Sequence, residues 1–234
     1  MKEIFHAANS RGYADHGWLK SYHSFSFADY HDPAKIRFGA LRVVNDDWIA
    51  GGGGFGTHPH DNMEIVTIVL EGALQHKDTL GNEYQITAGE VQRMSAGTGI
   101  AHSEFNASKD QAVNLFQIWV FPKERNITPS YEQKRFDVSK SNNRFQFLVS
   151  PDGKDGSLKI NQDSWFSQAT IDTAIEYPLH APNSGVYLIC ASGKVKIGSR
   201  TLSPRDAIGI SEVESISIQA LEKSHLVGIE IPMI

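Results

Sequence analysis

The chain has 234 residues, of which 40% are hydrophobic and 21% are charged, a balance typical of a globular protein with a substantial core. This composition excludes an intrinsically disordered chain, and the length suits one large β domain or two smaller ones. The 22 Lys and Arg residues against 27 Asp and Glu residues give a net charge of -5, which disfavours phosphate backbones and anionic lipid surfaces. We therefore expect no direct binding to nucleic acid.

The sequence also predicts a cytoplasmic protein that is not integral to a membrane. Residues 1–10 lack the apolar block of a secretory signal, and no run approaches the ~20 apolar residues that span a bilayer. The single cysteine, Cys190, lies in the apolar run 186–191, so no internal disulfide can form and a reducing compartment is acceptable. We interpret Cys190 as a core residue.

Short apolar runs separated by turn residues follow one another along the whole chain, and few windows carry the 3.6-residue period of a helix. In chain order, the predicted strands are residues 38–45, 64–71, 73–77, 84–86, 91–94 and 115–121, then 145–149, 158–160, 186–191, 194–197, 207–210, 215–218 and 226–231. The fold class is therefore predicted to be all-β.

A connection with two prolines, residues 122–130, divides the chain, and we place the domain boundary there, giving domains 1–125 and 126–234. Both halves place a glycine turn between two strands and later a turn leading through an acidic residue into another strand. A duplicated β-barrel would explain this pattern, and closing each barrel would remove exposed strand edges.

Two clusters of polar residues carry the chemistry of the first half. His58 and His60 follow a glycine-rich run, and His102 and Glu104 follow Gly97-Thr-Gly. In a strand, residues i and i+2 point to one face about 6.6 Å apart, so two such pairs can converge on one ion. Three neutral imidazoles and one carboxylate suit Fe(II), Mn, Ni, Co, Cu or Zn better than Ca or Mg.

Other polar residues near these clusters remain open to interpretation. Glu64 could be the fourth ligand instead of Glu104 if the chain bends after Pro59, or it could orient a histidine. His76 and Asp78 form another i, i+2 pair, which could support the metal ligands from behind, but we favour its interpretation as an ordinary polar strand face because no glycine turn flanks it.

Near the N-terminus, residues 22–33 alternate partly between apolar and polar side chains. Phe25 and Phe27 are expected on the core face of one strand, and His23 and His31 are interpreted as structural.

The first half resembles the pirin family of bicupins over roughly residues 11 to 137. The residues that carry the resemblance are Gly17-Trp, His23-Ser-Phe-Ser-Phe-Ala-Asp-Tyr, Phe38-Gly-Ala-Leu-Arg-Val-Val-Asn-Asp-Asp, Gly54-Phe-Gly-Thr-His-Pro-His-Asp-Asn-Met-Glu-Ile, Met94-Ser-Ala-Gly-Thr-Gly-Ile-Ala-His-Ser-Glu-Phe-Asn, Gln117-Ile-Trp-Val and Tyr131-Glu-Gln. Two positions depart from the broader cupin pattern, Gly72 and Gly97, and pirins share both departures.

This resemblance implies two consecutive cupin, jelly-roll-like β-barrels packed together, with a metal-binding barrel at 1–125 and a barrel without metal ligands at 126–234. By resemblance, the metal ligands are His58, His60, His102 and Glu104. The expected cofactor is one divalent transition metal ion, with Fe(II) favoured and Mn, Co, Ni, Cu and Zn as alternatives.

The resemblance also implies a quercetin 2,3-dioxygenase, which would use O2 to cleave a flavonol to a depside with release of carbon monoxide. Glu104 is the candidate catalytic base, with Glu64 as the alternative. Two other functions stay open: a metal-dependent regulatory protein that acts through a protein partner, and a hydrolase or isomerase that uses a non-redox metal. We expect a monomer.

Overall fold

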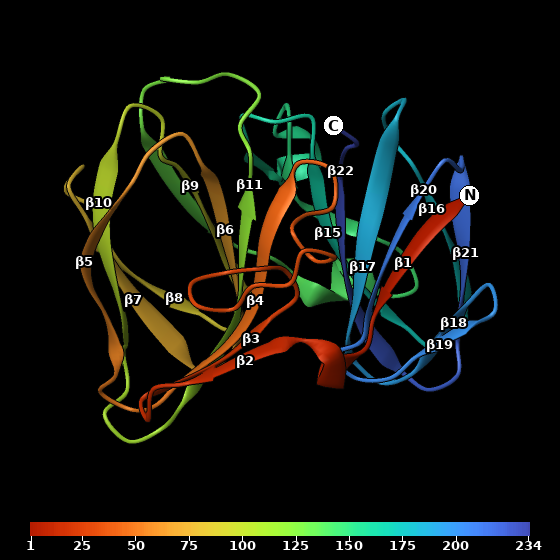
Figure 1. The fold of residues 1–234 in the computed structure, drawn as a ribbon, viewed down its shortest axis with the longest axis horizontal. Helices are drawn as coiled ribbons and strands as arrows, with labels where there is room; N and C mark the ends of the chain where they lie inside the picture. The colour runs from red at the N-terminus through yellow and green to blue at the C-terminus, as the bar shows by residue number, and fades with distance from the viewer.

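The computed structural model describes residues 1–234 and forms two lobes, each built from one seven-stranded and one four-stranded sheet (Figure 1). In the first lobe, the large sheet has the order β12 (Ser130–Arg135), β9 (Glu90–Ser95), β6 (Glu64–Glu71), β11 (Val113–Val120), β4 (Leu41–Ile49), β3 (Leu19–His23) and β2 (Gly12–Asp15). The small sheet has the order β5 (Gly54–His60), β10 (Ile100–Asn106), β7 (Ala73–Asp78) and β8 (Glu83–Thr87).

The second lobe repeats this arrangement. Its large sheet has the order β1 (Lys2–His6), β20 (Ala207–Ser211), β17 (Ser184–Ser192), β22 (Ser224–Pro232), β15 (Trp165–Ile171), β13 (Gln146–Ser150) and β14 (Leu158–Lys159). Its small sheet has the order β16 (Ala174–Pro178), β21 (Ser215–Ala220), β18 (Val195–Ile197) and β19 (Arg200–Leu202). The helices are three short 3-10 turns, Ala8–Ser10, Val138–Ser141 and Lys154–Gly156, and none is long and apolar enough to cross a membrane.

The two large sheets pack against each other and form the main core of the molecule. This core contains 24 buried residues from both lobes, among them Val44 and Ile118 of the first lobe and Tyr187 and Ile229 of the second. Because successive residues of a strand point to opposite faces, the neighbours of these core residues on β4 and β11 point into the first barrel. The outer face of this sheet therefore holds the lobes together, and its inner face is free to form a site.

The interior of the second lobe is filled differently. A separate cluster of 14 buried apolar residues lies inside it, including Leu188, Cys190 and Ile218. Cys190 is fully buried, which confirms its interpretation as a core residue.

Two strands pair with the lobe that does not contain the rest of their half of the chain. β1 pairs with β20 of the second lobe, so the red N-terminal strand lies among blue strands in Figure 1. β12 lies beyond residue 125 but pairs with β9 of the first lobe. At these two strands, the sheets do not follow the division predicted between residues 125 and 126.

Each predicted strand overlaps an observed one, and the all-β fold class is confirmed. The expected strand carrying Phe25 and Phe27 is wrong, because β3 ends at His23 and the chain turns, with Ala28 at a φ of 47° and Phe27 bridged to Tyr30. Phe25 is nevertheless buried in the core between the lobes.

Candidate metal centre and cavity

Three histidines meet where β5 runs antiparallel to β10. His58 lies opposite His102 in the strand register, and His60 follows two residues later on the same face of β5. One ligand nitrogen from each of the three rings lies within 4.8 Å of the other two. The two sequence clusters thus converge through these histidines.

Glu104 lies beside this group. The register of β10 against β5 shifts between His102 and Glu104, and the ligand atoms of Glu104, His102 and His76 form a second group within 4.8 Å. The Nε2 amides of Gln92 and Gln117 donate to Oε1 and Oε2 of Glu104 at 2.8 and 2.9 Å. Each carboxylate oxygen keeps a second lone pair, so these bonds fix the side chain and leave it able to bind a cation.

His76 is the residue that sequence reasoning placed wrongly. It is completely buried, stacks on Tyr131 at a centroid distance of 4.4 Å, and hydrogen-bonds Asp78 Oδ2 through Nε2 at 3.0 Å. The interpretation of this pair as an ordinary polar strand face is therefore wrong. A usable signal was present, because His76 shares its strand face with Leu74, which is also completely buried.

Burial keeps two of the candidate ligands, His60 and His102, in the neutral form that a metal requires. The pKa of His60 is lowered to about 4, first by burial and then by the neighbouring His102 and His58. Burial likewise lowers the pKa of His102 to about 3, with a further contribution from His58. Both imidazoles are neutral near pH 7 and offer lone pairs.

Burial shifts the pKa of the Glu104 carboxyl group in the opposite direction. Burial raises the pKa of Glu104, while His76 and the amide of Gln92 act to lower it. A cation bound next to this carboxyl group would favour its ionised form.

The residues present fit a divalent transition metal ion. His58 donates from Nδ1 to the carbonyl oxygen of Gly56 at 2.8 Å, so its Nε2 carries a lone pair. His102 Nε2 is buried and has no hydrogen-bond partner, which leaves a costly unsatisfied group unless an ion accepts its lone pair. Imidazole and carboxylate donors together suit Fe, Mn, Co, Ni, Cu or Zn.

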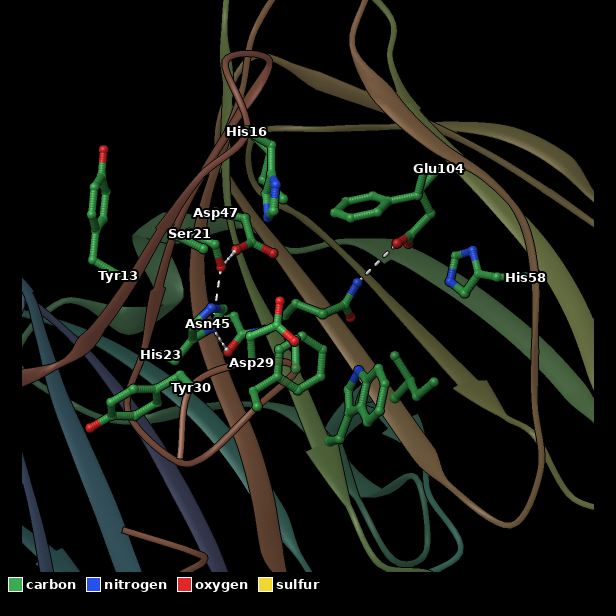
Figure 2. Close-up of a pocket in the computed structure, with 18 of the residues that line it drawn as sticks. Tyr13, His16, Ser21, His23, Asp29, Tyr30, Asn45, Asp47, His58 and Glu104 are labelled. Atoms are coloured by element: carbon green, nitrogen blue, oxygen red, sulfur yellow. Dashed lines mark hydrogen bonds between the residues drawn. The ribbon is translucent and has the colours of Figure 1, made fainter. Parts of the chain in front are cut away.

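A cavity of about 500 Å³ extends from the three histidines across the inside of the first lobe. Nine of its 20 lining residues are hydrophobic, including Phe27, Phe55 and Trp119. Figure 2 shows His58 and Glu104 at one side of this cavity and His23 at the other. His23, interpreted from sequence as structural, therefore lines the candidate site.

Comparison with known proteins agrees with this architecture. The family pattern described as Pirin matches residues 4–120, and the pattern described as the quercetinase C-terminal cupin domain matches residues 147–231. The chain is 46% identical over 226 residues to a protein of Escherichia coli K12 named quercetin 2,3-dioxygenase, covering 96% of each chain. The chain belongs to the pirin family.

Solved structures extend this similarity to the whole pirin chain. The crystal structure of YhhW from Escherichia coli matches with a TM-score of 0.95 and 45% identity, covering 100% of this chain and 99% of that one. The bacterial pirin YhhW in complex with nickel(II) matches with a TM-score of 0.94 and 45% identity over 100% of both chains. The bicupin fold class is thus confirmed.

In this pirin, Glu64 lies apart from both groups of candidate ligands. It is 1% exposed, and its Oε2 accepts hydrogen bonds from Ser95 Oγ at 2.7 Å and from the backbone N–H of Asn161 at 3.2 Å. Neither partner is a histidine, and Asn161 follows β14 of the second lobe. The structure therefore gives Glu64 a role in joining the lobes.

Proposed function

We propose that the protein is a metal-dependent dioxygenase that cleaves flavonols such as quercetin with O2. The observation that carries this proposal is the group of three histidines at one end of a cavity whose lining includes nine hydrophobic residues. The similar Escherichia coli protein is named quercetin 2,3-dioxygenase, and the similar YhhW has been solved with nickel(II). Family, ligand set and cavity support the same reaction class.

His58, His60 and His102 would hold the metal, and Glu104 would complete the ligand set. A bound divalent transition metal would supply Lewis acidity toward the 3-hydroxyl of the substrate and a path for electrons to O2. We propose Fe(II) as the native ion, while Mn, Co, Ni, Cu and Zn also suit these donors.

Glu104 is the proposed catalytic base that accepts the proton of the 3-hydroxyl. A general base must be able to reach its proton, and two amide hydrogen bonds fix this carboxylate beside His102. A metal bound beside it would keep this carboxylate ionised and so able to accept a proton. No other carboxylate belongs to either group of candidate ligands.

The apolar side chains of the cavity wall would bind the rings of the substrate and exclude water. Phe27, Phe55 and Trp119 offer flat surfaces to an aromatic ligand, and they keep water away from the reacting ring. The overall reaction consumes one O2 per flavonol and yields a depside and one carbon monoxide, so no external reductant is needed.

The test is flavonol loss under air by metal-stripped protein that is reloaded separately with Fe, Mn, Co, Ni, Cu and Zn. We expect turnover with redox-capable ions, and we expect His58→Ala to lose both bound metal and turnover. His31→Ala is the matched control, because His31 is an exposed histidine outside the cavity. If His58→Ala kept both metal and turnover, this function would be wrong, whereas metal binding without turnover by any ion would favour a metal-dependent binding protein.

A further inference from the structure

A second group of polar side chains lies in the cavity wall away from the histidines. Ser21 and His23 alternate on β3, and Asn45 and Asp47 alternate on β4, so all four share the inner face of the large sheet. They sit in two cross-strand pairs, Ser21 with Asp47 and His23 with Asn45. Figure 2 shows these four side chains linked by hydrogen bonds.

The hydrogen bonds within the cluster leave two acceptors free. Ser21 Oγ donates to Asp47 Oδ1, and His23 Nδ1 lies 2.8 Å from Asn45 Oδ1. An amide oxygen only accepts, so Nδ1 of His23 carries the proton and Nε2 carries a lone pair. Neither His23 Nε2 nor Asp47 Oδ2 has a partner in the protein, and neither is sealed from solvent.

These two acceptors open into the cavity from side chains that are otherwise enclosed. Asp47 is only 4% exposed and His23 only 3% exposed, and both line the cavity wall together with apolar side chains. In the free protein, water can donate to the two acceptors, but a ligand that fills the cavity displaces that water and must donate in its place. Two free acceptors in one wall therefore suit a ligand that carries hydroxyl donors.

The distance from the metal end fits an elongated ligand. Asn45 lies opposite Gln117 in the strand register, and Gln117 donates to Glu104. Neighbouring strands lie ~4.8 Å apart, so His23 on β3 is about 10 Å across the sheet from Gln117 on β11. The cavity thus has two polar regions about two strand spacings apart, with aromatic side chains such as Phe27 among the residues that line it.

We propose that Ser21, His23, Asn45 and Asp47 form a recognition site for hydroxyl groups at the end of an aromatic substrate remote from the reacting 3-hydroxyl. This inference rests on the proposed flavonol-cleaving function and specifies its substrate class, namely flavonols with additional hydroxyl groups on a distal ring. When its carboxyl group is ionised, Asp47 accepts a hydrogen bond from one of those hydroxyls through Oδ2, and His23 accepts another through Nε2. The four residues determine specificity, and they take no part in the bond-breaking steps.

The experiment compares quercetin with 3-hydroxyflavone, which keeps the reacting 3-hydroxyl and 4-keto group but has no other hydroxyl. The variants Asp47→Leu and His23→Phe each remove one free acceptor and keep much of the side-chain volume. We expect the ratio of kcat/KM for quercetin over 3-hydroxyflavone to fall about tenfold in each variant, mainly through KM for quercetin. Turnover of 3-hydroxyflavone should persist, which shows that each variant is folded and that its metal end is intact.

Asp15→Asn is the matched control, since Asp15 is exposed on the neighbouring strand β2 and does not line the cavity. It should keep the ratio of the unaltered protein. A ratio that stays unchanged in both cavity variants would overturn the inference.

A second readout separates this inference from the proposed function. The affinities of nickel(II)-loaded protein for the two flavonols are measured without O2, by quenching of tryptophan fluorescence. If the unaltered protein cleaves neither compound, the proposed function fails, and the ratio of the two dissociation constants then carries the test. A preference for quercetin that Asp47→Leu and His23→Phe abolish supports the recognition site, and equal affinities in all proteins contradict it.

Discussion

His102 Nδ1 lies 3.5 Å from Nδ1 of His76, whose Nε2 in turn lies 3.0 Å from Asp78 Oδ2. Hydrogen bonds to Asn82 and to the backbone of Leu80, together with His76, hold the pKa of Asp78 below its usual range against the effect of burial, so it remains a carboxylate. It therefore accepts the Nε2 proton of His76, which leaves Nδ1 of His76 as an acceptor for the Nδ1 proton of His102. The chain Asp78–His76–His102 thus selects the His102 tautomer whose Nε2 lone pair is free for a metal.

Replacing Asp78 with asparagine should weaken metal binding about 10- to 100-fold. The amide keeps one oxygen for the backbone N–H groups of Leu80 and Asn82, which now bond to Asp78 Oδ1. An amide nitrogen facing His76 Nε2 would favour the reversed tautomer of both imidazoles and would place a proton on His102 Nε2. Competition titration of nickel(II) against a chelator measures the loss.

Asn82→Ser is the control for the relay, because Asn82 contacts both carboxylate oxygens of Asp78 but contacts neither histidine. It should leave the affinity within a few-fold of the original value. Equal losses in Asp78→Asn and Asn82→Ser would show that the loop geometry, and not the tautomer, controls the site.

The sequence predicts the long apolar strands and the histidine group, although β5, β10 and β15 are not among the predicted strands. β6 and β17 are long apolar runs buried on both faces, and such runs are visible without knowledge of the fold. The convergence of His58 and His102 depends only on strand periodicity and on the pairing of β5 with β10.

Long-range features are hidden from the same reasoning. β1 and β12 are short strands with mostly exposed or half-buried residues, so their exchange between lobes depends on partners far along the chain. Gln92 and Thr67 look like solvent-facing strand residues, yet both are fully buried and hydrogen-bond each other at 3.0 Å. Polar residues at alternate positions of a strand usually face solvent, but in this barrel they face a polar interior.

Asp46 joins the N-terminal segment, the first lobe and the second lobe through one buried carboxylate. Its Oδ2 lies 3.2 Å from Arg11 Nη1, and its Oδ1 lies 3.2 Å from Arg205 Nη1 and accepts from Asn114 at 2.9 Å. Asp46→Ala would leave Arg11, whose side chain is 7% exposed, without its ionic partner. We expect the free energy of unfolding to fall by about 3 kcal/mol, measured by urea denaturation.

A surface ion pair provides the contrast for that measurement. Lys2 and Glu212 lie 2.7 Å apart with exposed side chains, and Lys2→Ala should leave the denaturation midpoint nearly unchanged. If Asp46→Ala lowered the free energy of unfolding no more than Lys2→Ala, the contacts of the buried carboxylate between the lobes would not contribute to stability.

His6 should make stability fall in mild acid. It is 5% exposed, its Nδ1 lies 2.8 Å from Tyr187 Oη, and burial lowers its pKa to about 4. Between pH 6.5 and about 4 the unfolded chain therefore takes up a proton that the folded chain does not, so the free energy of unfolding decreases by at most about 1.4 kcal/mol per pH unit. His6→Asn removes this titration, so its loss of Tm between pH 7 and pH 5 should be smaller than that of the original protein; equal losses would contradict the assignment.

Asp47 should act on stability in the opposite pH direction. Burial raises its pKa to about 7, although the hydroxyl of Ser21 acts to lower it. The unfolded chain releases this proton near pH 4 and the folded chain only near pH 7, so stability is full below pH 4 and falls as the pH rises through this interval.

Asp47→Asn tests this direction. The asparagine keeps an oxygen that can accept from Ser21 but cannot ionise, so the Tm of the variant should exceed that of the original protein at pH 8, and the gain should shrink toward pH 4. The difference corresponds to an upper limit of about 4 kcal/mol. Thermal unfolding across this range checks the sign, and a gain that does not vary with pH would mean that Asp47 is already ionised in the folded protein. A gain that appears only at high pH would show that the cavity retains a destabilising carboxyl group, as expected if substrate hydroxyls are its natural partners.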